Sequence, residues 1–277
     1  MLPILKNDEI APNIFEMVIE YPRLAQKAQP GHFVIVMSDT EVSERIPLTI
    51  ADFDRKAGTL TLVIMAIGTS TRKLVRLKAG EKLPTMIGPL GHASELKNFG
   101  TVMMVAGGVG TAPVYPIARA LREKGNRVIS IQGARTKELL FWTEKLSAVS
   151  EEHIITTDDG SAGRKALVTE PLREILETKS KEIGCVYMIG PAIMMKFCAQ
   201  TIVPFGVKGV ASLNSVMIDG TGMCGGCRVT IGKDTKFTCV DGPEFDASLI
   251  DWDILLARQK MYCEEEKCSL NHYICNT

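Results

Sequence analysis

The chain has 277 residues, 45% of them hydrophobic, and its 32 basic and 32 acidic side chains give a formal net charge of zero. This length is enough for two or three domains with cores of their own. Balanced charge does not favour binding to nucleic acid or to an anionic membrane surface, which both attract a basic excess. The first twenty residues lack the uninterrupted apolar core of a signal peptide, so we expect a cytoplasmic protein with no membrane segment.

Residues 1–97 are predicted to form an all-β domain. Short runs rich in β-forming residues at 33–37 and 59–64 are separated by turns that contain glycine and proline. This spacing is typical of a small β-barrel. A stretch with helical periodicity interrupts the strands at 71–77.

Residues 98–210 change to an alternation of strands and helices. The predicted strands are 102–105, 127–131, 154–157 and 186–189, and the predicted helices are 112–124, 137–149, 170–181 and 193–202. Such an alternation predicts a doubly wound parallel sheet with helices on both faces. The remainder, residues 211–277, is short and rich in cysteine. The fold class we predict is therefore a multidomain β plus α/β protein with a small C-terminal domain.

The eight cysteines are concentrated toward the C-terminus, since five of them follow residue 226. Clustered cysteines in a cytosolic chain favour metal binding over disulfides. Asp219, Cys224 and Cys227 have the C-x4-C-x2-C spacing of plant-type [2Fe–2S] ferredoxins, with aspartate in the first position, and Cys239 follows as a fourth ligand. The intervening glycines allow backbone N–H groups to approach the inorganic sulfides.

This metal prediction has two alternatives. The first is a structural zinc knuckle, although zinc normally takes two cysteine pairs or a cysteine pair with two histidines. The second concerns Asp219, which either ligates iron or only caps the loop. Cys185 and Cys198 are expected in the core. The other three cysteines, at 263, 268 and 275, are expected on a solvated tail.

Two glycine turns predict a dinucleotide site. The run 107–113, GGVGTAP, follows a strand and opens a helix, where glycines permit a sharp turn and close approach of a pyrophosphate. Gly190-Pro191 repeats this arrangement after a later strand, and both turns are expected to face one crevice beyond the carboxyl ends of the strands. Arg135 is expected near the adenosine ribose, serving a 2′-phosphate or stacking on adenine. The residues predicted to bind NAD(H) are Gly108, Gly110, Thr111, Arg135, Gly190 and Pro191.

Two segments of the β region predict a flavin site. Arg45 is suited to neutralise a phosphate, and Thr49 to hydrogen-bond the edge of a flavin ring. The run 68–71, GTST, offers hydroxyls and N–H groups at the start of a helix. Each segment alone is equally typical of an ordinary strand or helix cap. The residues predicted to bind FAD are Arg45, Pro47, Leu48, Thr49, Gly68, Ser70 and Thr71.

These motifs occur in a characteristic order along nearly the whole chain. RxPxT at 45–49, GPLG at 88–91, GGVGTAP at 107–113, GARTKELLF at 133–141 and DGTGMCGGC at 219–227 follow one another. In this order they resemble the ferredoxin–NADP reductase superfamily, in the branch with a C-terminal [2Fe–2S] domain. Asp219 makes the chain most similar to the small (alpha) subunits of NADH-dependent reduced ferredoxin:NADP oxidoreductases. The electron-transfer subunits of dihydroorotate dehydrogenase, which hold their cluster with four cysteines, are the nearest alternative.

The resemblance implies FAD in a barrel at 1–97, NAD(H) in an α/β domain at 98–210, and a [2Fe–2S] cluster in a domain at 211–277. It implies hydride exchange with NAD(H) and relay of single electrons to a larger partner subunit with FAD and [4Fe–4S] clusters. The partner's flavin would carry out bifurcation, and NADP(H) and ferredoxin would be reached through it. No catalytic side chain is expected, because the flavin supplies the chemistry. A third hypothesis is a non-catalytic regulatory protein with a zinc knuckle on a reductase fold.

Overall fold

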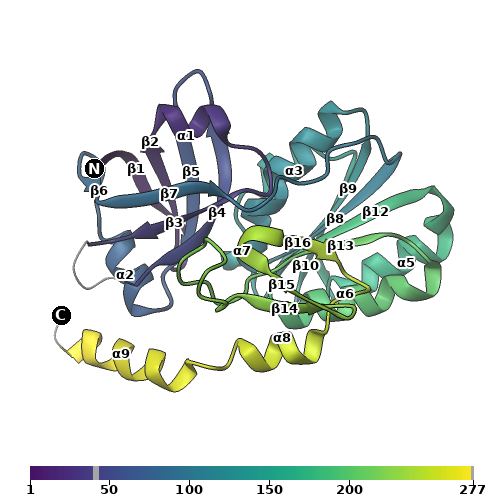
Figure 1. Cartoon of the computed structure of the whole chain (residues 1–277). Helices are drawn as coiled ribbons and strands as arrows, with labels where there is room; N and C mark the ends of the chain where they lie inside the picture. Colours follow the sequence, from purple (N-terminus) through teal and green to yellow (C-terminus); the bar gives the residue numbers. More distant parts are fainter. Residues whose placement is uncertain (40–43, 276–277) are drawn as a thin grey trace.

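The computed structural model describes residues 1–39 and 44–275. Two seven-stranded sheets lie side by side, and the C-terminal segment lies beneath both of them (Figure 1). None of the helices among the described residues is long and apolar enough to cross a membrane.

The N-terminal sheet is antiparallel and curls into a barrel-like shape. Its strands are β1 (Leu2–Ala11), β2 (Ile14–Glu20), β3 (Phe33–Met37), β4 (Ile46–Asp54), β5 (Thr59–Met65), β6 (Lys82–Leu83) and β7 (Thr85–Leu90), in the order β6-β1-β2-β5-β4-β3-β7. Two helices, α1 (Pro22–Lys27) and α2 (Thr69–Val75), complete it. Alternate residues such as Leu60, Leu62 and Ile64 are fully buried inside the curl, as a strand with one face on a core requires. We call this unit the barrel.

The second sheet is parallel in its centre. Its strands are β8 (Thr101–Gly107), β9 (Arg127–Ala134), β10 (Glu152–Thr157), β11 (Arg164–Lys165), β12 (Ile183–Ile189), β13 (Gly209–Ser212) and β16 (Glu244–Asp246), in the order β11-β10-β9-β8-β12-β13-β16. Only β16, at the edge, runs antiparallel to its neighbour among these described strands.

Helices cover both faces of this sheet, so the predicted doubly wound architecture is confirmed. They are α3 (Thr111–Glu123), α4 (Thr143–Ala148), α5 (Thr169–Lys179) and α6 (Ala192–Ile202), with the 3-10 turns η1 (Gly108–Gly110), η2 (Lys137–Leu139), η3 (Ser180–Glu182) and η4 (Val203–Phe205). One core lies under α3 and α4, and the other lies under α5 and α6. Cys185 and Cys198 belong to these cores, as expected.

The single helix predicted over 137–149 is wrong. The chain forms η2, then extends, and begins α4 only at Thr143. Phe141 is buried, its carbonyl accepts a hydrogen bond from Gln132 Nε2, and Trp142 adopts a left-handed backbone conformation (φ 53°). These tertiary contacts override the local helical periodicity.

The C-terminal segment contacts both sheets. It contains β14 (Arg228–Ile231), β15 (Asp234–Phe237), α7 (Thr238–Asp241), α8 (Trp252–Arg258) and α9 (Cys263–Cys275). Cys227 and Cys239 pack against Phe33 and Ile35 of β3 in one apolar cluster, which Leu90 of β7 joins. Strand β16 returns to the α/β sheet beside β13, so residues placed in the predicted third domain extend the sheet of the second.

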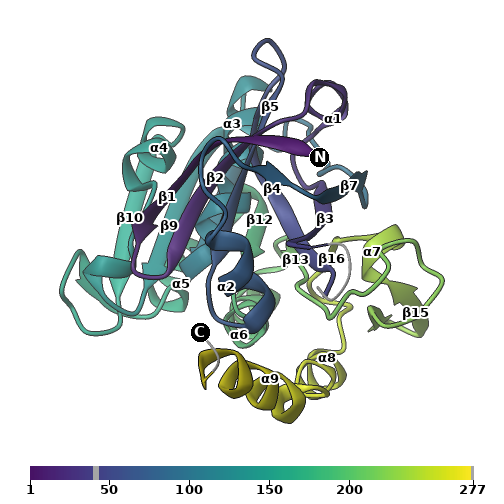
Figure 2. The same ribbon diagram turned by 90° about the vertical axis from the view of Figure 1, so that its left-hand side faces the viewer.

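The last three cysteines lie on a segment with no buried residue, as predicted, but this segment is a helix rather than an irregular tail. Residues 263–275 form α9, which lies along α2 in both views (Figures 1 and 2). Thr69 Oγ1 and Ser269 Oγ are 3.0 Å apart, and the Arg76 guanidinium lies 5.1 Å from the centre of the Tyr273 ring. None of the described residues of α9 is buried. The helix therefore contacts the barrel through a few surface side chains rather than through a packed apolar face.

Candidate functional site

The two predicted dinucleotide turns meet at the point where the strand order of the α/β sheet reverses. Strands β8 and β12 are neighbours there, and each ends in one of the turns. A Cβ added to Gly110 would lie 2.1 Å from the carbonyl oxygen of Ile189, and one on Gly190 would lie 3.0 Å from that of Gly107. Because glycine has no side chain, the two turns can come into contact. This is the place where open α/β sheets bind ligands.

Gly108 differs from its neighbours because the space in front of it is open. Its φ is +54°, which favours glycine, and no atom lies within 4 Å of a Cβ built there. Thr111, next along the turn, starts α3 and is 1% exposed. Arg135 is exposed just beyond the end of β9, at the same edge of the sheet. Pro191 is exposed at the opposite lip.

A buried amide that sequence reasoning missed lies behind this turn. Gln132 on β9 donates from Nε2 to the Phe141 carbonyl (2.8 Å) and lies 3.4 Å from Thr111 Oγ1. Its Oε1 has no hydrogen-bond partner among the described residues. An unsatisfied buried acceptor is uncommon, and only the folded positions of β9 and α3 reveal it.

The barrel brings the two predicted flavin segments together. Pro47, Leu48 and Thr49 are half-buried on β4, paired with β3, and Arg45 is exposed just before β4. Ser70 at the start of α2 donates from its hydroxyl to Glu44 Oε2 (3.0 Å). The start of β4 and the start of α2 therefore adjoin.

The side chains at the start of α2 are already hydrogen-bonded within the chain. Thr71 Oγ1 accepts from Gly68 N (3.0 Å) and donates to the Gly68 carbonyl (3.1 Å), which closes the first turn. Nε of Arg72 is buried and has no hydrogen-bond partner among the described residues. Sequence reasoning did not select this cation, which is suited to an anionic group beside α2.

Two of the four predicted cluster ligands form a buried pair. Cys227 Sγ and Cys239 Sγ are 3.2 Å apart, and the two residues are 2% and 1% exposed. Burial and the neighbouring Cys227 sulfur raise the pKa of Cys239. Two buried thiols so close together cannot both ionise unless a cation neutralises them, which is what a bound metal does.

The other two predicted ligands lie apart from this pair. Asp219 accepts hydrogen bonds from Thr221 N and Cys224 N, both at 2.8 Å, so its carboxylate caps the loop. These backbone donors, Thr221 first, hold the pKa of Asp219 below its ordinary value. Cys224 is exposed. Within residues 1–39 and 44–275 no three Cys, His, Asp or Glu side chains gather into a metal-binding group.

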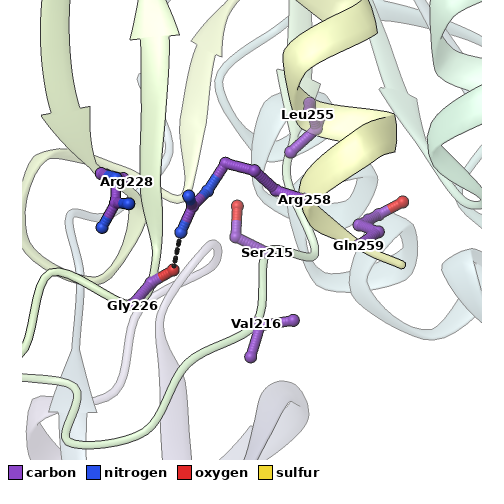
Figure 3. A pocket seen from close by; sticks show the side chains of 7 residues that line it. All are labelled: Ser215, Val216, Gly226, Arg228, Leu255, Arg258 and Gln259. Atoms are coloured by element: carbon purple, nitrogen blue, oxygen red, sulfur yellow. Dashed lines mark hydrogen bonds between the residues drawn. The ribbon is translucent and has the colours of Figure 1, made fainter. Parts of the chain in front are cut away.

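Two arginines hold the backbone of the cluster loop. Arg258 on α8 donates from Nη2 to the Gly226 carbonyl (2.9 Å), as Figure 3 shows, and Arg228 donates from Nη1 to the Gly225 carbonyl (3.2 Å). Ser215 and Gln259 line a small pocket beside them. Both guanidinium groups thus place positive charge beside the loop between Cys224 and Cys227, and the cysteine spacing gave no sign of them.

A wider groove continues from this pocket to the dinucleotide lip. It lies between α8 and the start of α6 and is lined by Pro191, Ala192, Ile193, Asn214, Val216, Leu256 and Gln259. The cluster loop and the Gly190-Pro191 turn therefore border adjoining pockets, which share Val216 and Gln259.

Comparison with known proteins assigns this arrangement to a family. Residues 214–251 match the iron-sulfur cluster binding domain of dihydroorotate dehydrogenase B, and residues 104–200 match the oxidoreductase NAD-binding domain. The electron transfer subunit homolog of dihydroorotate dehydrogenase B (NAD(+)) from Thermotoga maritima is 43% identical over 98% of this chain and 95% of its own length. The chain belongs to the dihydroorotate dehydrogenase B electron-transfer subunit family.

One further relative and one solved structure are also similar to this chain. The electron transfer subunit of Lysinibacillus sphaericus is 33% identical and covers 87% of this chain and 94% of itself. A solved structure of an NADH-dependent reduced ferredoxin-NADP oxidoreductase, described for flavin-based electron bifurcation, is 42% identical with a TM-score of 0.93, over 99% of this chain and 98% of its own.

The family assignment confirms several predictions made from the motifs. The chain is an oxidoreductase subunit with an NAD-binding domain and an iron-sulfur cluster binding domain. The predicted resemblance to the ferredoxin:NADP oxidoreductase small subunits is confirmed by the structural neighbour. As an electron-transfer subunit, the chain works with a larger partner.

Proposed function

We propose that the chain exchanges a hydride with NAD(H) and relays single electrons to its partner subunit in a flavin-based bifurcating NADH-dependent ferredoxin:NADP oxidoreductase. It would hold one FAD and one [2Fe–2S] cluster and act in the cytoplasm. The similarity to the bifurcating oxidoreductase over 99% of the chain supports this proposal.

The observation that carries the proposal is the contact between the thiol pair and the barrel. Strand β3 turns Phe33 and Ile35 toward Cys227 and Cys239, and it turns Val34 and Val36 into the barrel core. Its neighbour β4 carries Leu48 and Thr49, paired with Val34 and Phe33. The predicted flavin edge on β4 is therefore paired with the strand that contacts the predicted cluster ligands.

The barrel residues fit a flavin dinucleotide. Leu48 and Thr49 would orient the ring, and Arg45, Gly68, Ser70 and Thr71 would face the phosphates. The Ser70 hydroxyl donates a hydrogen bond to Glu44. When FAD binds, the hydroxyl would donate to a phosphate oxygen instead. The unpartnered Nε of Arg72 adds a donor from the same helix.

The α/β turns fit a nicotinamide dinucleotide. Gly108 leaves open space for a pyrophosphate, Gly110 and Gly190 let the two turns touch, and Thr111 offers N–H and hydroxyl groups at the start of a 13-residue helix. Pro191 would form the opposite lip. Arg135 would lie along the adenosine ribose.

Two of the four ligands that an iron–sulfur cluster would need already lie close together in the C-terminal loop. Cys227 and Cys239 supply buried sulfur, and Asp219 and Cys224 would complete the set by turning toward them. When bound, the flavin and the cluster would convert a two-electron exchange into single-electron steps. The protein residues position the groups, balance their charge and exclude water.

The larger partner would hold a second FAD and [4Fe–4S] clusters, through which NADP(H) and ferredoxin are reached. A second candidate function, electron transfer for a dihydroorotate dehydrogenase, is favoured by the family match at residues 214–251. Asp219 opposes it, because that family branch is expected to have four cysteines around its cluster.

Reconstitution with the two kinds of large subunit separates these functions. We would combine the purified chain with a large subunit of a bifurcating oxidoreductase, or with a dihydroorotate dehydrogenase catalytic subunit. NAD and ferredoxin reduction driven by NADPH only in the first complex supports the proposal. NAD reduction driven by dihydroorotate only in the second would overturn it.

A further inference from the structure

The α/β domain packs directly on the outer face of the barrel. Ala11, Ile14, Ala51 and Val63 of the barrel share one buried apolar cluster with Ala112 and Phe141 of the α/β domain. Such a contact resembles a small core rather than a loose interface between domains. The barrel and the α/β domain are therefore joined at this face.

A buried carboxylate joins the two domains at the edge of this cluster. Glu16 on β2 is 8% exposed. It accepts hydrogen bonds from Trp142 Nε1 (2.7 Å) and Lys145 Nζ (3.3 Å) of the α/β domain and from Lys6 Nζ (2.7 Å) of its own barrel. Burial favours the protonated acid, but Lys6 and Lys145 outweigh it and hold the pKa of Glu16 below its ordinary value.

Trp142 is held in a conformation that it would not choose alone. Its φ of 53° lies in the left-handed region, which is strained for a residue other than glycine. The ring makes edge contacts with Tyr115 and Phe141, and the Lys145 ammonium lies 3.8 Å from its centre. Together with the bond to Glu16, these contacts over-determine its position, which is typical of a residue under functional constraint.

The same segment reaches the dinucleotide turn. The Phe141 carbonyl accepts from Gln132 Nε2, and that nitrogen lies 3.4 Å from Thr111 Oγ1. Thr111 belongs to the proposed NAD(H) turn. A continuous series of contacts therefore runs from that turn through the buried Gln132 and Phe141 to the half-buried Trp142 and to Glu16 of the barrel.

A second polar contact crosses the same face and is more exposed. Asp52 of β4 and Arg119 of α3 form an ion pair of 2.7 Å, with side chains 24% and 29% exposed. Loss of Glu16 alone would therefore leave the domains attached, by this ion pair and by the apolar cluster, but would free them to tilt.

We propose that Glu16 and Trp142 are positioning residues, which fix the nicotinamide site against the flavin site for hydride exchange. This inference rests on the proposed function. Neither residue needs to touch a cofactor, since both act through the angle between the domains. Hydride exchange depends steeply on this angle, because a misplacement of about 1 Å can cost about 100-fold in rate.

Two conservative variants and one control test the proposal. Glu16→Gln keeps an acceptor for Trp142 but loses the attraction of Lys6 and Lys145. Trp142→Phe keeps an aromatic ring but removes the N–H donor together with part of the ring surface that contacts Tyr115 and Lys145. The control is Glu174→Gln, which breaks an exposed ion pair with Arg164 (2.6 Å) inside the α/β domain. We call the Glu16–Trp142 contact the clamp, and Glu16→Gln and Trp142→Phe the clamp variants. If one of these two variants fails to fold, the other still tests the proposal.

We would follow flavin reduction in the full chain by anaerobic rapid mixing with NADH, and separately with dithionite. The proposal predicts at least about a tenfold fall in the limiting rate with NADH in both clamp variants. It also predicts less than about a threefold change in the dissociation constant for NADH, and unchanged reduction by dithionite. The control should stay within about twofold of the wild type. Rates within twofold in both clamp variants, or an equal fall in the control, would overturn it.

Hydrogen exchange of the chain as purified separates failure of the clamp from failure of the proposed function. Faster exchange at residues 14–16 and 141–146 in both clamp variants supports the clamp, whereas unchanged exchange there contradicts it. A wild-type flavin that NADH does not reduce would instead contradict the proposed function. Exchange would then decide whether Glu16 and Trp142 still join the domains.

Discussion

At the scale of single residues, the thiol pair carries most of the chemical specificity. Cys227 and Cys239 are twelve positions apart in sequence and 3.2 Å apart in space. The metal site was predicted from the spacing of Asp219, Cys224 and Cys227, with Cys239 as a fourth ligand. The fold adds that both lie in an apolar cluster against the barrel, where an unneutralised thiolate would be costly.

Replacement of one of these thiols should remove the cluster and leave the flavin. We expect Cys239→Ser to lower iron from about two per chain, as one binuclear cluster requires, to less than half of that value. Cys198→Ala is the matched control, because Cys198 is equally buried but lies in the core under α6. Iron and flavin analysis of the purified variants checks this. Full iron in Cys239→Ser, or equal loss in the control, would remove Cys239 from the ligand set.

Glu244 gives the chain a dependence on pH in the neutral range. Burial raises the pKa of its carboxyl to about 7, and the hydrogen bond from Ser94 Oγ (2.5 Å) opposes this only in part. The folded state therefore binds the proton more tightly than the unfolded state. The free energy of unfolding should fall as pH rises from the unfolded pKa near 4.5 through 7.

Glu244→Gln should remove this term. Relative to the wild type, the variant should gain unfolding free energy between pH 5 and pH 8, by about 3 kcal/mol at most. Urea unfolding at the two pH values measures the difference. A gap between variant and wild type that does not change with pH would show that the carboxyl titrates outside this range.

At the scale of elements, the glycine turns explain how strand ends become a binding edge. Gly110 and Gly190 are needed for packing, whereas Gly108 is needed for its backbone conformation and for the open space in front of it. A substitution at Gly108 can be compared with one at a glycine that has a similar backbone conformation but lies away from the predicted site. Gly100, at the opposite end of β8, also has a positive φ (+85°) and open space.

Gly108→Ala should weaken NADH binding by about tenfold or more, because the new methyl group would occupy the space left for the pyrophosphate. Gly100→Ala should cost about the same stability, near 1 kcal/mol, and leave binding unchanged. Titration of both variants with NADH, beside thermal unfolding, checks this. Equal affinity in the two variants would place the dinucleotide elsewhere.

Helix α9 is a second case in which an element's role can be isolated. None of its described residues is buried, so truncation after Tyr262 should lower unfolding free energy by only about 1 kcal/mol. Exchange of backbone amides should increase in α2, which loses the contacts of Thr69 and Arg76. A global loss of folding after truncation would show that α9 has a larger role.

Sequence patterns predicted the central strands and the main helices of the α/β sheet because their periodicity is local, whereas strands such as β1 and β2 of the barrel were not singled out. Strand 33–37 has the predicted bounds, and α3 begins one residue before its prediction. The break at 140–142 could not be predicted, since Trp142 is held by Glu16, 126 positions away in sequence. Gln132, Arg72 and Arg258 were missed for the same reason. Each is a common residue type whose burial or contact depends on distant elements.

At the scale of the whole molecule, the three predicted sites lie around one strand pair. The cluster loop packs on β3, the predicted flavin edge lies on β4, and the dinucleotide turns adjoin the outer face of the barrel through α3. This order matches the order in which electrons would pass. Charge is balanced locally, by Arg258 and Arg228 at the loop and by lysines at Glu16, which fits a formal net charge of zero.

The most direct test of this account is an anaerobic absorbance spectrum of the isolated chain, with iron, sulfide and flavin analysis, before and after NADH. We predict about one flavin and about two irons per chain, as one FAD and one binuclear cluster require, and bleaching of both chromophores by NADH. Zinc without flavin, or a flavin that NADH leaves oxidised, would contradict the account.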